Sequence, residues 1–248
     1  MKNSSIFLQI IVVILIAEES SSLLAPSIKP CPINSPNLAD CVIKAIEKLK
    51  PEIGTGIYGP NLRTDVNLTK FNLGDISVDR SFKLKMTDMY GYGFNNFKIE
   101  KLRINPENFK IDAIMFFPHA DVYSKYFLAW NLGIFTLQGG GDMSVSIDKS
   151  RILLKFVGST YFKNGVEHIK IDTIQMTIKS AEMRVYFDNL FNGQKALEQA
   201  ANEVINQNID IIKGDVVPLI EQRISSVVLK IANQIFASGT HKDFFPVN

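Results

Sequence analysis

The sequence predicts an α+β fold in which a long C-terminal helix is wrapped by a highly curved antiparallel β-sheet. Two observations carry this prediction. Segments of alternating polar and apolar residues run from about Leu62 to Asp188, and one continuous helical pattern runs from about Gln194 to Phe236. No second long helical pattern is available to form a coiled coil with the latter. A sheet with one apolar face and a helix with one apolar stripe can bury each other's surfaces.

Composition places the chain among globular proteins. Of its 248 residues, 46% are hydrophobic and 21% are charged, close to the globular average and unlike a disordered chain. The formal net charge of +2 is too small to indicate a nucleic-acid partner. Gly91 and Gly93 lack the third glycine and the following helix of a dinucleotide loop, so we expect no cofactor.

The first 22 residues are interpreted as a secretory signal peptide. Lys2 supplies a positive charge, the stretch from Ile6 to Ala17 is mostly apolar, and small and polar residues follow up to Ser22. Cleavage after Ser22 fits best, and cleavage after Ala17 is the alternative. The apolar stretch is short for a bilayer span, although a retained anchor is the competing interpretation. Residues 23–248 would then form one secreted, extracellular domain.

In an oxidising compartment, Cys31 and Cys41 are expected to form one disulfide, with two free thiols as the alternative. Two cysteines alone do not make a zinc site, so no metal is expected. Asn67 begins an Asn-Leu-Thr triplet, which is a glycosylation acceptor only if the chain is secreted.

A first helix is predicted close to the cysteines. Ser35 can cap this helix, Pro36 suits its first position, and Pro51 and Gly54 are expected to end it. Its apolar residues recur at helical spacing: Leu38, Cys41, Val42, Ala45, Ile46 and Leu49. The disulfide would therefore join the N-terminal arm to this helix.

Alternation with a period of two predicts the strands and their inward faces. The inward apolar residues are Ile76, Val78, Phe82, Leu84 and Met86, then Phe109, Ile111, Ala113, Met115 and Phe117, then Met143, Val145 and Ile147, and then Ile152, Leu154 and Phe156. Turn signals at Asn105-Pro106, Gly139–Gly141 and Asn164-Gly165 predict antiparallel hairpins between these runs. Ile114 and Phe116 are exceptions, because they are apolar at outward positions.

The C-terminal helix presents an apolar stripe from Leu197 to Ile235. Pro218 lies four residues after Gly214, so the proline ring faces the carbonyl of a residue without a side chain. We therefore expect a kink rather than a break there. Asn208 falls on the stripe and needs a hydrogen-bond partner if it is buried.

The sequence contains no recognisable catalytic or metal-binding motif. The three histidines, His119, His168 and His241, have no H-x-x-x-H or H-E-x-x-H spacing, and no G-x-S-x-G element is present. We expect His119 and His241 to lie on the solvated surface. The protein is therefore not expected to be an enzyme, unless its site is scattered along the chain.

Several segments resemble the insect takeout and juvenile-hormone-binding protein family, and more closely its takeout-like, circadian clock-controlled members. These segments are Tyr186–Gly193, Lys195–Leu197 with Asn202, Asn206 and Asn208, Lys230–Phe236, Asp243–Pro246, and Cys31-Pro32 with Cys41 and Leu49–Ile57. They cover essentially the whole chain after the signal peptide, in order. Hormone-binding members typically carry a second disulfide, for which this chain has no cysteines, so the resemblance favours a takeout-like protein.

The resemblance implies a fold of the lipid-binding TULIP superfamily with an internal hydrophobic tunnel. It also implies a secreted carrier of a small hydrophobic ligand, such as a terpenoid, a fatty-acid-like lipid or juvenile hormone. Roles in circadian rhythm, feeding or chemosensation are implied in the same way. The alternation alone leaves a cavity and a fully packed core equally open, whereas the resemblance favours the cavity.

The family has no fixed motif for tunnel-lining residues, so parity alone selects the candidates. The predicted ligand-binding residues are Met86, Met115, Phe117, Trp130, Phe135, Met143 and Phe156. Tyr123, Gln138 and Tyr161 are candidates for the polar contacts that would set specificity. The competing functions are a membrane-active lipid-transfer or defence protein and a secreted hydrolase. We expect a monomer without stable membrane insertion.

Overall fold

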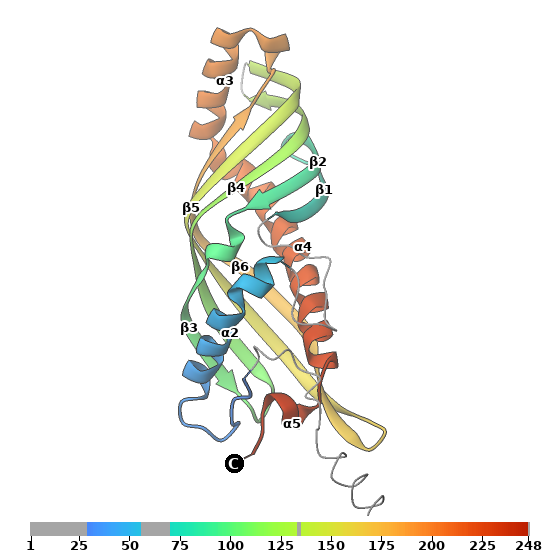
Figure 1. Cartoon of the computed structure of the whole chain (residues 1–248). Coiled ribbons are helices and arrows are strands. Elements are labelled where there is room, and N and C mark those ends of the chain that lie inside the picture. The colour runs from blue at the N-terminus through green and yellow to red at the C-terminus, as the bar shows by residue number, and fades with distance from the viewer. Residues whose placement is uncertain (1–28, 56–69, 133–134, 248) are drawn as a thin grey trace, which may run out of the picture.

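The computed structural model describes residues 29–55, 70–132 and 135–247 (Figure 1). The predicted signal peptide and Asn67 lie outside these residues. The elements are α2 (Leu38–Thr55), β1 (Phe71–Asp79), β2 (Lys83–Tyr92), η1 (Phe94–Asn96), β3 (Lys98–Asn105), β4 (Lys110–Leu132), β5 (Phe135–Lys163), β6 (Val166–Phe187), η2 (Phe191–Gly193), α3 (Lys195–Gln207), α4 (Ile209–Ala237) and α5 (His241–Phe244). Within the described ranges, none of the helices is long and apolar enough to cross a bilayer.

The strands form an antiparallel sheet in the order β1-β2-β4-β5-β6, and β3 pairs with the first part of β4. Three strands are long: β4 has 23 residues, β5 has 29 and β6 has 22. Long strands curl because each is rotated relative to its neighbour. Figure 1 shows the sheet curling along α4, with α3 at the upper end and α5 at the lower end. The predicted curved sheet with a long C-terminal helical segment is confirmed.

The inward-facing residues change parity halfway along both β4 and β5. The buried residues are odd-numbered before Pro118 and even-numbered after it on β4, and the same change occurs at Lys149 on β5. The two positions are neighbours in the ladder, next to the pair Phe117–Ser150, and Lys149 has a φ of 49°. The apolar face therefore stays on one side of the sheet through an irregularity in both strands. Both β5 parities predicted from the sequence are confirmed.

Two of the three predicted turns are confirmed, at Asn105-Pro106 between β3 and β4 and at Asn164-Gly165 between β5 and β6. The third is wrong, because Gly139–Gly141 lie inside β5 and pair with β4. A Cβ on Gly139 would lie 3.0 Å from the Leu190 side chain and 3.2 Å from the Tyr126 hydroxyl. Glycine is needed there because the chain that follows β6 passes close to the strand.

The predicted C-terminal helix is divided into α3 and α4, and the break lies at Asn208 and not at Pro218. Asn208 has φ −109° and ψ 23°, and its Nδ2 donates a hydrogen bond of 2.8 Å to the Val204 carbonyl. An asparagine side chain bonded to a main-chain carbonyl competes with the helical ladder. α4 continues through Pro218, which lies within it. Leu197, the first residue of the predicted stripe, is 47% exposed.

The first helix also runs further than predicted. α2 begins at Leu38, just after a turn in which the Asn37 main-chain N–H donates to the Ser35 hydroxyl at 3.2 Å. It then passes through Pro51 and Gly54 and ends at Thr55. A proline inside a helix removes one hydrogen-bond donor and can kink the helix without ending it. The prediction that Pro51 ends the helix is therefore wrong.

The predicted disulfide between Cys31 and Cys41 is present and joins the N-terminal arm to α2. The same arm pairs with the C-terminal tail. The Cys31 main-chain N–H donates to the Phe244 carbonyl and the Ile33 N–H donates to the Pro246 carbonyl, both at 3.1 Å. The two ends of the described chain are thus tied together at the lower end of the molecule.

Side chains of α3 and α4 pair with the free edge of β6. The Asn202 amide accepts from the Phe187 N–H at 2.8 Å and donates to the Phe187 carbonyl at 2.9 Å. Asn206 bonds in the same two-way manner to Val185, at 2.9 and 2.7 Å. Four helical residues rise about 6 Å, and two strand residues rise about 6.7 Å. Side chains spaced i, i+4 on the helix therefore match alternate residues of the strand.

The same pairing recurs further along α4. Glu221 accepts from the Ile178 N–H at 2.7 Å, and Ser225 accepts from the Met176 N–H at 3.1 Å. Asn233 donates to the Ile171 carbonyl at 2.8 Å and accepts from the Ile171 N–H at 2.9 Å. These contacts fix the helix along the sheet edge and so set the height of the space beneath it.

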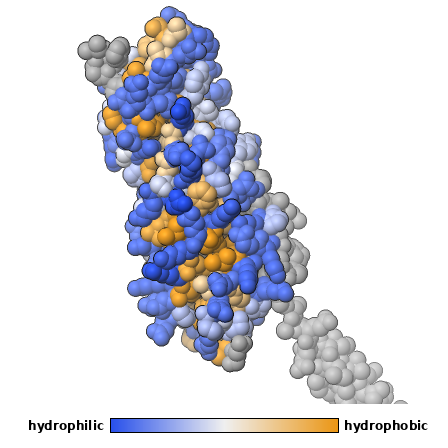
Figure 2. Space-filling model, turned by 90° about the vertical axis from the view of Figure 1, so that its left-hand side faces the viewer, coloured by the Kyte–Doolittle hydropathy of each residue, from blue (hydrophilic) through white to orange (hydrophobic). Residues whose placement is uncertain are grey.

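The outer face of the sheet is not uniformly polar, as predicted. Ile114 and Phe116 are only partly covered, and the Arg151 guanidinium lies 5.0 Å from the centre of the Phe116 ring. Tyr123 and Phe127, also outward-facing, are nearly half exposed. Figure 2 shows hydrophobic area among hydrophilic side chains, most of it in the lower half of the face displayed.

Candidate ligand-binding site

An upper apolar cavity of about 110 Å³ lies between the sheet and the first half of α4. Strands β1, β2, β4, β5 and β6 contribute to its wall, and α4 covers it with Ile212, Val216 and Ile220. Five of the seven methionines of the chain line it: Met86, Met89, Met143, Met176 and Met183. Methionine side chains are flexible and polarisable, so they adapt to ligands of different shape. This wall can therefore adjust to what it holds.

A lower apolar cavity of about 310 Å³ lies beneath β3, β4 and β5. α2 covers it with Ala45 and Ile46, and the end of α4 covers it with Ala232 and Ile235. The aromatic rings of Phe97, of Phe236 in α4, and of Phe244 and Phe245 in the C-terminal tail contribute to the wall. Its volume reaches the lower end of the range for small-molecule pockets. The lower cavity alone is thus large enough for a small lipophilic molecule.

The two cavities adjoin at a group of buried side chains. Ile152 lines the upper cavity, and Leu154, two residues further along β5, lines the lower one. Phe117 and Phe97 meet between them, one lining each cavity, with ring centres 6.0 Å apart. All four belong to one buried cluster. The structure thus contains two adjoining apolar cavities, and a continuous tunnel stays a prediction.

The parity-based candidates fall into three groups. Met86, Phe117 and Met143 line the upper cavity, and Met115 and Phe156 line the lower cavity. Trp130 belongs to neither wall among the described residues. Its side chain is buried against Phe82, with ring centres 5.3 Å apart. The side chain of Phe135 lies outside the described residues.

Parity selected inward residues without showing which of them border empty space, so it could not exclude Trp130. It also missed the helix residues of both walls, which have no period-two signal. The methionine content was a usable signal, because Met89, Met176 and Met183 all line the upper cavity.

The residues predicted to make polar contacts with the ligand are wrong, because their side chains point away from the cavities. Tyr123 is 49% exposed and contacts Tyr92 edge to face on the outer surface. Tyr161 is also exposed and stacks on His168, and Gln138 is exposed. These side chains lie on the outward parity of β4 and β5, where they cannot reach a ligand under the sheet.

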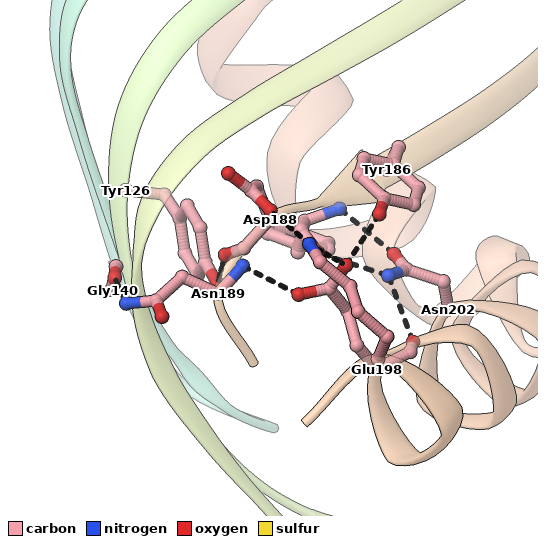
Figure 3. A network of polar contacts seen from close by, with 9 residues as sticks. Tyr126, Gly140, Tyr186, Asp188, Asn189, Glu198 and Asn202 are labelled. Atoms are coloured by element: carbon pink, nitrogen blue, oxygen red, sulfur yellow. Dashed lines mark hydrogen bonds and ion pairs between the residues drawn. The ribbon is translucent and has the colours of Figure 1, made fainter. Parts of the chain in front are cut away.

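A buried carboxylate holds the upper end of the molecule together (Figure 3). The Glu198 side chain is fully buried. It accepts hydrogen bonds from the Tyr186 hydroxyl at 2.5 Å, the Lys195 ammonium at 3.0 Å and the Asn189 main-chain N–H at 2.8 Å. The hydrogen bond from Tyr186, followed by that from Lys195, lowers the pKa of Glu198, because both favour the ionised form.

The segment that follows β6 adds further contacts to this network. The Tyr126 hydroxyl donates to the Asp188 carbonyl at 2.5 Å, and the Asn189 amide donates to the Gly140 carbonyl at 2.9 Å. Burial, with the negative charge of Asp188 nearby, raises the pKa of Tyr126. The polar groups of the network form hydrogen bonds with one another. The network therefore has a structural role, which is to attach α3 to β6.

The three histidines have different partners, and that of His168 is the Gly239 carbonyl, 3.0 Å from its Nδ1. His119 lies on the surface, as predicted, with its ring nitrogens 2.7 Å from Asp148 and 3.0 Å from Asp121, and the hydrogen bond to Asp148 raises its pKa most. His241 was placed wrongly, because its side chain is only 14% exposed and lies 3.6 Å from the Glu167 carboxylate. Among the residues that the structure describes, no three histidine, cysteine or acidic side chains are arranged to hold a metal.

Comparison with known proteins adds a family and a fold. The family model described as haemolymph juvenile hormone binding protein matches residues 9–246. The crystal structure of Takeout 1 from Epiphyas postvittana is similar to the chain, with a TM-score of 0.76 at 17% identity, covering 89% of this chain and 100% of that one.

A crystal structure of lipopolysaccharide binding protein gives a TM-score of 0.40 at 11% identity, covering 79% of this chain and 38% of that one. No curated protein sequence matches.

Proposed function

The chain belongs to the haemolymph juvenile hormone binding protein family. From this premise we propose that it is a secreted carrier, which holds one small lipophilic ligand between its sheet and its helices. The supporting observation is the pair of adjoining apolar cavities beneath the sheet. The ligand is a terpenoid, a fatty-acid-like molecule or a related lipid, with juvenile hormone among the candidates. The role is binding and transport rather than catalysis.

The driving force is the removal of apolar ligand surface from water. Burial contributes about 25 cal/mol per Å². A terpenoid or acyl chain that buries ~400 Å² would gain roughly 10 kcal/mol before the cost of association. The two walls consist almost entirely of apolar side chains, so they offer this gain to many ligands of suitable length. Length and shape would then select among them.

The first experiment is organic extraction of the protein secreted from insect cells, followed by mass spectrometry. We expect a lipid at close to one molecule per protein, and its chain length gives the ligand class. An empty protein that also fails to bind a fluorescent fatty-acid probe would contradict a carrier function.

Substitutions that fill the cavities test where the ligand binds. Ala113→Phe adds a ring to the wall of the lower cavity and Val145→Phe adds one to the upper wall. We expect each to weaken probe binding at least ~10-fold, since a ring excludes part of the ligand. Val157→Phe on the exposed side of β5 is the matched control and should bind as the wild type does. Equal binding by all three variants would place the ligand elsewhere.

A further inference from the structure

One polar side chain is carried into the upper cavity by the irregularity in β5. Lys149 has a φ of 49°, and the inward parity changes there from odd to even. Ser150 is the first residue of the new parity and pairs with Phe117 across the ladder. Its side chain therefore faces the cavity near the rings that separate the upper cavity from the lower one.

The Ser150 hydroxyl has no partner among the described residues. Ser150 is only 5% exposed and lines the upper cavity. No hydrogen bond joins its side chain to another described residue. Its oxygen is not among the fully buried atoms without a partner in the described chain, so it keeps a small exposed area. Buried hydroxyls are normally hydrogen-bonded, because an unmade bond costs free energy. The other buried serine of the described chain, Ser124, donates 2.7 Å bonds to main-chain carbonyls and follows this rule.

The remaining wall of the upper cavity is apolar except for Lys213. The Lys213 side chain is 30% exposed, and its ammonium lies 3.4 Å from the Asp210 carboxylate. That charge is therefore already paired at the surface, where α4 borders solvent. The interior of the cavity offers a ligand one neutral hydroxyl.

We infer that Ser150 is the specificity-determining residue of the upper cavity and that it hydrogen-bonds a neutral oxygen of the bound lipid, as found in a ketone, aldehyde, ester or alcohol. This inference rests on the proposed carrier function. A free carboxylate does not suit the position, because burying an ionised group beside an uncharged hydroxyl costs far more than one hydrogen bond returns. The cavity thus favours an otherwise apolar ligand that carries one neutral oxygen over a ligand that carries none.

A set of ligands matched in length tests the inference. Dodecane, dodecanol, methyl decyl ketone and dodecanoate compete against a fluorescent probe on the wild type, on Ser150→Ala and on Ser146→Ala, a control on the same strand. In the wild type we expect the ketone and the alcohol to bind more tightly than dodecane. Ser150→Ala should weaken both by roughly five-fold and leave dodecane unchanged, whereas Ser146→Ala should change neither.

The outcomes separate this inference from the carrier function. Displacement by all four ligands with no effect of Ser150→Ala would overturn the role of Ser150 and leave the carrier intact. Preferential binding of dodecanoate, unaffected by Ser150→Ala, would also overturn it and would point to Lys213. Equal weakening of dodecane and the ketone would indicate a structural role for the serine. Failure of the probe itself to bind would overturn the carrier function as well.

Discussion

At the upper end of the molecule, noncovalent polar contacts attach α3 to β6, whereas at the lower end a disulfide and two main-chain hydrogen bonds tie the N-terminal arm to α2 and the tail. The upper fastening is centred on the buried Glu198 and Asn202. The lower one is centred on Cys31 and Cys41. The upper end is therefore sensitive to protonation and the lower end to reduction. Each end also contributes to a cavity wall, because Phe187 lines the upper cavity and Cys31 lines the lower one.

The largest effect is expected from breaking the upper fastening at Asn202. Asn202→Ala leaves the buried N–H and carbonyl of Phe187 without their partner. Each unmade bond costs about 1–3 kcal/mol, so we expect a loss of about 3 kcal/mol in the free energy of unfolding. Urea unfolding measures it. Gln199→Ala, an exposed change on the same helix, is the control and should cost less than ~0.5 kcal/mol. A similar loss in both variants would show that the edge contact is not responsible, since alanine favours the helix at both positions.

A somewhat smaller effect is expected at the lower end. The cysteines are ten residues apart, and closing such a loop in the unfolded chain stabilises by roughly 2–3 kcal/mol. The double variant Cys31→Ser, Cys41→Ser should lose this amount in urea unfolding under oxidising conditions. Reductant should destabilise the wild type and Asn202→Ala equally, and leave the double variant unchanged. A reductant effect that differs between the wild type and Asn202→Ala would show that the contacts at the two ends are coupled.

The smallest effect is a dependence on pH confined to the acid range. The pKa of Glu198 is lowered in the folded state, chiefly by the hydrogen bond from Tyr186. The ionised carboxylate therefore stabilises the fold above its unfolded pKa of about 4.3, and this stabilisation is lost as the pH falls through the lower folded value. The difference in unfolding free energy between the wild type and Glu198→Gln should be constant near neutrality and shrink below about pH 4.

The matched control for this titration is Asp210→Asn, whose carboxylate is 92% exposed. Its difference from the wild type should show little change over the same range, since exposed pairs contribute little. A Glu198→Gln difference that is independent of pH would mean that the pKa of Glu198 is the same in the folded and unfolded states, which would contradict this prediction.

The fold was largely predictable because each strand buries one face. Alternation placed Ile76, Val78, Leu84 and Met86 inward, and all four are buried. Even the change of parity within β5 could be followed, because the runs ending at Ile147 and beginning at Ile152 each kept their own alternation. Burial of one face of a sheet therefore requires apolar residues at alternate positions, and this pattern can be recognised in the sequence.

Features set by contacts between distant segments were not predictable in the same way. The break at Asn208 depends on where its amide finds a carbonyl, whereas the sequence pattern predicted one continuous helix with only a kink at Pro218. Gly139–Gly141 suggested a turn, whereas they serve the close approach of the chain after β6. The cavity walls draw on α2 and α4, whose apolar residues are equally suited to a filled core. Only packing decides which of them border empty space.

The side chains of α3 and α4 along β6 have a consequence for the behaviour of the protein in concentrated solution. A bare strand edge offers unpaired N–H and carbonyl groups to any passing strand, and so invites edge-to-edge aggregation. Here Asn202, Asn206 and Asn233 occupy both groups of the residues that they face. At these positions the strand edge has no unpaired N–H or carbonyl group that could bind a strand of a second molecule. The same amides that hold the helix in register thus protect a long sheet from polymerising.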